Sequence, residues 1–226
     1  SDWSDSMKVR AAVFGLVSGF FFYIGFYLYQ RSVRACGATL AGAFGKIGIL
    51  IPATLSLILW KESPTSIQWV GIAIAVIAIV VAVLDFQSLK VDAVHGVLLV
   101  FFLVGGLGDF STKVFEVYNN TDYTEIFLLA NFFSALLWSL PGALKAKAID
   151  GSNLIAGVLI GIPNLLTSYF LVYAMTEVSA VIVFPMFSGG TVVVVSLVSA
   201  LLFREKLQHK EYASIALVVM ALLLIQ

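Results

Sequence analysis

Residues Phe44–Ala78 read FGKIGILIPATLSLILWKESPTSIQWVGIAIAVIA, and residues Phe187–Ala221 read FSGGTVVVVSLVSALLFREKLQHKEYASIALVVMA. The two stretches align without a gap, 143 positions apart, and share several identical residues. An aromatic residue, a cation and a glutamate fall at the same place in both, as Trp60-Lys61-Glu62 and Phe203-Arg204-Glu205. An internal repeat in a hydrophobic chain is typical of transporters, in which two similar bundles move around a site between them.

The composition identifies lipid as the solvent for most of the chain. Hydrophobic residues make up 61% of the sequence and charged residues 12%, with a mean hydropathy of +1.03. A soluble domain contains about 45–50% apolar and about 25% charged residues. The formal net charge is zero, which does not favour nucleic acid as a partner. We therefore interpret the chain as an integral membrane protein with the lipid bilayer as its main partner.

Eight apolar stretches are long enough, or nearly so, to cross a bilayer as helices, which takes about 20 residues each. They are Val9–Tyr29, Gly37–Trp60, Ser66–Leu84, Ala93–Thr112, Thr124–Leu144, Asn153–Ala174, Ser179–Phe203 and Glu211–Gln226. Helices are expected because backbone polar groups in hydrocarbon must be satisfied within the segment. The predicted fold is an all-α membrane protein with eight transmembrane helices.

The repeat divides these helices unevenly. Residues 1–85 hold three of them and form a partial first repeat, whereas residues 93–226 hold five and form a complete second repeat. We therefore expect an inverted repeat of five plus five helices from which the first two are missing, with a naturally eight-helix protein as the alternative. Lys and Arg are more numerous on the connections opposite the N-terminus, which taken alone would place those connections in the cytoplasm. The orientation stays open because the expected missing helices could carry the deciding charges.

Several fixed polar points resemble EamA-type transporters of the drug/metabolite transporter superfamily. Residues Phe44–Pro52 (FGKIGILIP) and Trp60–Pro64 (WKESP) are similar to the fourth and fifth helices of that family, and Gly108–Lys113 (GDFSTK) is similar to the end of its sixth helix. The resemblance implies ten helices in two inverted repeats, both termini in the cytoplasm, and export or exchange of small metabolites. This implied orientation conflicts with the distribution of positive charge.

Lys46 is the most informative single residue. It lies near the middle of a predicted span, where a charge costs about 2.5–3.5 kcal/mol on translocon scales. A lysine there should face a cavity, and we predict that it binds a carboxylate or phosphate group of the substrate. The alternative is a structural lysine held by backbone carbonyls that Pro52 leaves free.

Other polar residues inside the spans are candidates for the substrate path, since buried amides and phenols need partners in hydrocarbon. We predict that Tyr23, Asn131, Asn164 and Ser188 line this path with Lys46. Prolines within the spans remove backbone hydrogen bonds and create points where a helix can bend. Pro52 and Pro185 are therefore predicted gating positions.

Asp109 and Lys113 lie four residues apart and can form an ion pair along one helix. We predict a coupling or gating role for them, with a neutralised structural pair as the alternative. Gly106-Leu107-Gly108-Asp109 also matches the G-x-G-D pattern of intramembrane aspartyl proteases. That chemistry needs two carboxylates that share a proton, and no second one in a comparable pattern is evident.

The leading hypothesis is a secondary-active transporter that moves a small polar or amphipathic metabolite by alternating access. The sequence contains no phosphate-binding glycine loop, metal-ligand spacing or Ser/His/Asp set, so we expect no enzymatic activity, cofactor or metal. The expected location is a cell membrane, the bacterial inner membrane in particular, with the protein as a monomer or homodimer. The alternatives are an aspartyl-protease-like membrane enzyme and a non-transporting, truncated relative.

Overall fold

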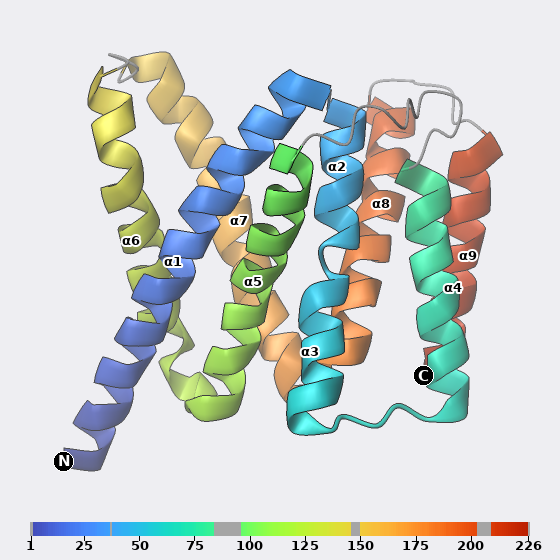
Figure 1. Cartoon of the computed structure of the whole chain (residues 1–226), viewed down its shortest axis with the longest axis horizontal. Helices are drawn as coiled ribbons and strands as arrows, with labels where there is room; N and C mark the ends of the chain where they lie inside the picture. Colours follow the sequence, from blue (N-terminus) through green and yellow to red (C-terminus); the bar gives the residue numbers. More distant parts are fainter. Residues whose placement is uncertain (1, 37, 84–95, 146–149, 203–208, 226) are drawn as a thin grey trace. The chain divides into compact units, whose positions relative to one another are not determined.

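The structure is a computed structural model that describes residues 2–36, 38–83, 96–145, 150–202 and 209–225. All regular secondary structure in these residues is helical (Figure 1), which confirms the predicted all-α class. The elements are α1 (Asp2–Cys36), α2 (Ala38–Ile47), α3 (Leu50–Trp60), α4 (Ser66–Val83), α5 (Gly96–Tyr118), the short 3₁₀ helix η2 (Thr121–Tyr123), α6 (Thr124–Lys145), α7 (Gly151–Glu177), α8 (Ala180–Leu202) and α9 (His209–Ile225).

Five helical segments in the described part of the chain are long and apolar enough to cross a membrane. They are Asp5–Ala35, Gly96–Tyr118, Thr121–Lys145, Gly151–Glu177 and Ala180–Val198. Three shorter apolar helical segments accompany them, at Phe44–Trp60, Ser66–Val81 and Tyr212–Ala221. The chain is therefore a multi-pass membrane protein, while the predicted count of eight spans stays a prediction.

The span predicted at Gly37–Trp60 contains two helices in its described part, because α2 ends at Ile47 and α3 begins at Leu50 (Figure 1). The Gly48 amide donates to the Phe44 carbonyl at 2.9 Å, and the Ile51 amide donates to the Gly48 carbonyl at 3.0 Å. Pro52 has no N–H group to donate to the Gly48 carbonyl, so the ordinary helical bond at this point cannot form. The proline thus explains why the helix is interrupted one turn before it.

The contacts divide the chain into two compact units. Unit 1 consists of Ser1–Phe26 and Gly108–Glu177, and unit 2 consists of Tyr27–Leu107 and Val178–Gln226. These units are defined by contacts in space, whereas the predicted division into residues 1–85 and 93–226 rests on sequence similarity. The repeat boundaries therefore stay a prediction.

In unit 1, α1 packs closely against α6. A Cβ atom on Gly15 would lie 2.3 Å from the Phe127 carbonyl oxygen, so the backbones approach more closely there than a side chain would permit. The Ser134 hydroxyl donates a 2.8 Å hydrogen bond to the Leu16 carbonyl across the same seam. Small residues that allow such approach are the usual means of helix association in lipid, where the hydrophobic effect does not hold helices together.

In unit 2, α4 packs against α9, and α3 packs against α8. Within each pair the two helices run in opposite directions (Figure 1). The buried Ser214 hydroxyl of α9 donates to the Ala78 carbonyl of α4 at 2.9 Å. Ile72, Val181 and Ile182 form a buried apolar cluster between α4 and α8. Apolar packing and interhelical hydrogen bonds such as this one thus hold this unit together.

Candidate functional site

The residues predicted from the sequence lie in both units. Unit 2 contains Lys46, Ser188, Pro52 and Pro185, and unit 1 contains Tyr23, Asn131, Asn164, Asp109 and Lys113. Their roles in substrate binding and gating stay predictions, and the local geometry of each is described within its own unit.

Lys46 lies in the last turn of α2, immediately before the interruption at Gly48. The hydroxyl of Ser188, which is 1% exposed, lies 3.4 Å from the Lys46 backbone carbonyl and donates to it. The two predicted substrate contacts from different helices are therefore neighbours. The carbonyl end of a helix attracts positive charge, so the position of Lys46 also fits the alternative of a structural lysine.

The interruption beside Lys46 is closely covered by α5. A Cβ atom on Gly106 would lie 2.6 Å from Ile51 Cδ1 and 2.7 Å from the Gly48 carbonyl oxygen. Only a glycine allows α5 to approach the break between α2 and α3 this closely. The first glycine of the G-x-G-D pattern thus has a packing explanation that requires no protease chemistry. Pro52 and Pro185, the two predicted gating prolines, are both fully buried.

Asn131 lies on α6 in the seam with α1 and is 5% exposed. Its side-chain oxygen has no hydrogen-bond partner among the described residues. A buried polar atom without a partner costs about 1–3 kcal/mol, so its retention in the core calls for a reason such as ligand contact or bound water. Tyr23 on α1 and Asn164 on α7 are both half-buried.

Lys113 has a partner that the sequence analysis missed. Its ammonium group lies 2.6 Å from a carboxylate oxygen of Glu116, and the two side chains are only 6% and 15% exposed. The spacing of three residues is compatible with such a pair and could have identified Glu116 from the sequence. A buried lysine with this partner is neutralised inside the protein, whereas the predicted pairing with Asp109 remains a prediction.

Glu62 connects the segment after α3 to the start of α8. Lys61 adopts a left-handed backbone conformation, with φ of 53°, at the end of α3. The Glu62 carboxylate then accepts a 3.2 Å hydrogen bond from the amide of Val181, in the first turn of α8. Negative charge at the amino end of a helix is favourable, and a contact over 119 residues cannot be found from local spacing. Glu205, its counterpart in the repeat, lies outside the described residues.

The comparison with protein families agrees with the resemblance found in the sequence. Residues 1–84 match the EamA-like transporter family, which confirms the predicted relationship to the drug/metabolite transporters over this part of the chain. The matched segment contains Lys46, Pro52 and Glu62. No curated protein matches the sequence. The family match covers residues 1–84 of the 226, and the apolar helices indicate a multi-pass membrane protein.

Proposed function

From the EamA-like segment at residues 1–84, we propose that this chain is a secondary-active transporter of the bacterial inner membrane. It moves a small polar or amphipathic metabolite by alternating access between two inverted repeats, and Lys46 binds an anionic group on that metabolite. Energy comes from a gradient of substrate or ion across the membrane.

The observation that carries this proposal is the pairing of repeat-related helices in unit 2. Ser214 is the counterpart of Gly71, and Ala78 is the counterpart of Ala221, each pair 143 positions apart. Both Ala78 and Ala221 are fully buried where α4 and α9 pack in opposite directions. Helices related by a two-fold axis in the membrane plane run antiparallel in this way, which supports an inverted repeat.

Two positions of the repeat differ in side-chain size between the two halves, and one of them is that of Lys46. A Cβ atom on Gly189 would lie 3.2 Å from the Val218 side chain, so the second half has a small residue on α8 against a large one on α9. Their counterparts in the first half are Lys46 and the fully buried Ala75. This difference in size supports a substrate contact that differs between the halves, because Lys46 provides a positive charge where its counterpart Gly189 provides none.

The two glycine pairs support an architecture with further helices. Helix α6 occupies the space beside Gly15 and Gly19 of α1, whereas a Cβ atom on Gly157 or Gly161 of α7 would meet nothing within 4 Å. In the ten-helix arrangement that the family resemblance implies, α7 is the counterpart of α1, and α6 has as its counterpart a further helix that would pack against α7. That helix would fill the open glycine face of α7.

Transport in proteoliposomes tests the proposal. The chain is reconstituted alone and together with the two preceding helices of an EamA-type protein, and uptake of a metabolite panel is measured with and without an imposed gradient. We expect gradient-dependent uptake of an anionic metabolite, loss of this uptake in Lys46→Ala, and partial retention in Lys46→Arg. Lys8→Ala, at an exposed lysine, is the matched control and should transport normally.

Two results would contradict the proposal. Unchanged transport by a folded Lys46→Ala variant would remove Lys46 from the substrate site. The absence of uptake of every metabolite in the panel, with and without the added helices, would favour the non-transporting relative.

A further inference from the structure

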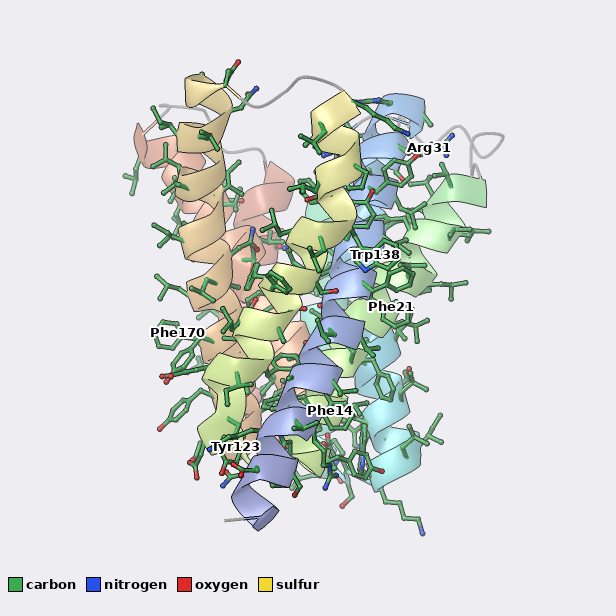
Figure 2. All side chains as sticks on the ribbon, turned by 90° about the vertical axis from the view of Figure 1, so that its left-hand side faces the viewer. Phe14, Phe21, Arg31, Tyr123, Trp138 and Phe170 are labelled. Carbon is green, nitrogen blue, oxygen red and sulfur yellow. The ribbon has the colours of Figure 1, made fainter. Side chains whose placement is uncertain are left out.

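Unit 1 has a small polar pocket where η2 leads into α6 and where α7 ends. The pocket has a volume of about 230 Å³. Its lining consists of two carboxylates, two phenols and three threonines, namely Asp122, Glu125, Tyr169, Tyr173, Thr121, Thr124 and Thr176. Figure 2 shows Tyr123 at this end of α6 and Phe170 pointing outward from α7. These residues belong to none of the predicted substrate contacts.

Asn120 holds Asp122, one of the two carboxylate residues of the pocket, in place at the start of η2. Its side-chain oxygen accepts from the Asp122 amide at 3.0 Å, and its side-chain nitrogen donates to one oxygen of the Asp122 carboxylate at 2.7 Å. This double contact orients the Asp122 carboxylate before any ligand arrives. A preoriented group loses less conformational entropy on binding than a mobile one.

The hydroxyl protons of two lining threonines are already used within the protein. Thr124 donates to the Thr121 carbonyl at 2.6 Å, and Thr176 donates to the Tyr173 carbonyl at 2.7 Å. Each hydroxyl oxygen can then only accept further hydrogen bonds. With the two carboxylates, which accept as well, the pocket favours a ligand that donates hydrogen bonds or carries positive charge.

The aromatic residues narrow the chemistry of that ligand. Tyr169 and Tyr173 lie four residues apart, on one face of α7, and both line the pocket. The Tyr169 ring packs edge-on against Phe170, with centroids 5.8 Å apart. Phenol rings attract ammonium groups through their π faces, and the described residues contain no group of three or more His, Cys, Asp or Glu that could hold a metal ion.

We propose that this pocket binds an organic ammonium ion, with Asp122 and Glu125 supplying the opposite charge and Tyr173 and Tyr169 contacting its apolar groups. Carboxylates at the start of a helix also stabilise that helix through its dipole, which alone would explain Asp122 and Glu125. It would not explain two phenols and two acceptor-only hydroxyls around the same space. The pocket shares no lining residue with the predicted substrate contacts, and its occupancy does not depend on transport.

Tetramethylammonium is the probe for this site, added to the purified chain in a nonionic maltoside detergent and followed by ligand-observed saturation-transfer NMR. We expect saturable binding that the neutral neopentyl alcohol does not reproduce. Tyr173→Leu keeps an apolar side chain but removes the ring, and it should weaken binding about two- to fivefold, as expected for a cation–π contact at an exposed site. Asp122→Asn should weaken it by at least as much. Asp5→Asn removes one exposed carboxylate elsewhere in unit 1 and is the matched control.

Binding that is saturable, selective for the cation and weakened in both pocket variants but not in Asp5→Asn supports the proposal. Equal binding of tetramethylammonium by all four proteins would overturn it, because the ion would then be held elsewhere. Equal binding of neopentyl alcohol to the original chain would also overturn it and does not depend on the folding of any variant.

Discussion

The seam between α1 and α6 makes a quantitative prediction about the two glycine pairs. A Cβ atom on Gly19 would lie 2.1 Å from the Asn131 carbonyl oxygen and 2.7 Å from Ser134 Cβ. Atoms in ordinary contact are about 3.5 Å apart, so Gly19→Ala must separate the helices by roughly 1 Å. That movement lengthens the 2.8 Å bond from Ser134 to the Leu16 carbonyl beyond hydrogen-bond range.

The expected loss of stability follows from these two effects. Overpacking a close contact costs about 1–3 kcal/mol, and an interhelical hydrogen bond in a membrane protein contributes about 0.6 kcal/mol. Gly19→Ala should therefore lower the free energy of unfolding by about 2–3 kcal/mol. Gly161→Ala is the same substitution on α7 at a position with nothing within 4 Å, and it should cause no loss.

Reversible unfolding in mixed micelles of dodecyl sulfate and dodecyl maltoside measures this difference. The fluorescence of Trp138 reports on the seam, because the centroid of its ring lies 5.1 Å from that of the Phe20 ring of α1. Replacing the other three tryptophans by phenylalanine isolates that signal. The reasoning is refuted if Gly19→Ala unfolds at the same detergent composition as the parent, or if Gly161→Ala loses as much stability.

Three further predictions concern polar contacts, each read in the same unfolding assay. Lys113→Met leaves Glu116 buried without its partner and should lower the free energy of unfolding by about 3–5 kcal/mol. Adding Glu116→Leu should restore part of this loss. A loss below about 1 kcal/mol, which is the size expected for an exposed pair such as Lys8 and Asp5, would contradict the buried ion pair. Glu62→Ala should cost about 1 kcal/mol by removing the acceptor at the start of α8, while Glu62→Gln, which retains a side-chain oxygen, should cost less; equal losses would argue against the hydrogen bond. Ser214→Ala should cost only about 0.6 kcal/mol, and a loss above about 2 kcal/mol would mean that the contact with α4 does more than bond one carbonyl.

Most of the fold could be predicted from the sequence because apolar length alone selects membrane helices. The expected stretches at 66–84, 93–112, 124–144 and 153–174 correspond to α4, α5, α6 and α7 within a few residues. The interruption at Gly48 was predicted only as a bend, since a proline in a sequence indicates a missing hydrogen bond but not how the chain accommodates it. Neighbouring α5, through Gly106, covers the break and allows it to persist.

The candidate site was less predictable than the fold. Sequence spacing suggested Asp109 as a partner of Lys113, and this pairing stays a prediction; the structure adds Glu116, which lies 2.6 Å from Lys113 on the same helix. Both spacings place a carboxylate on the same side of a helix, so spacing alone did not single out Glu116. The acceptor-rich pocket at the end of α7 combines residues from two segments about fifty positions apart, so it could not be predicted from a local sequence pattern.

By itself the sequence determined the solvent and the helical class, because hydrophobic length is a property of the chain alone, and its repeated spacing predicts an internal duplication. The tertiary structure decided which small residues are in contact. Gly15 and Gly157 begin the same small-residue pattern, yet the first is filled by α6 and the second is open. The structure also brought Glu62 to the amino end of α8. Such contacts depend on the arrangement of distant helices, which hydropathy does not encode.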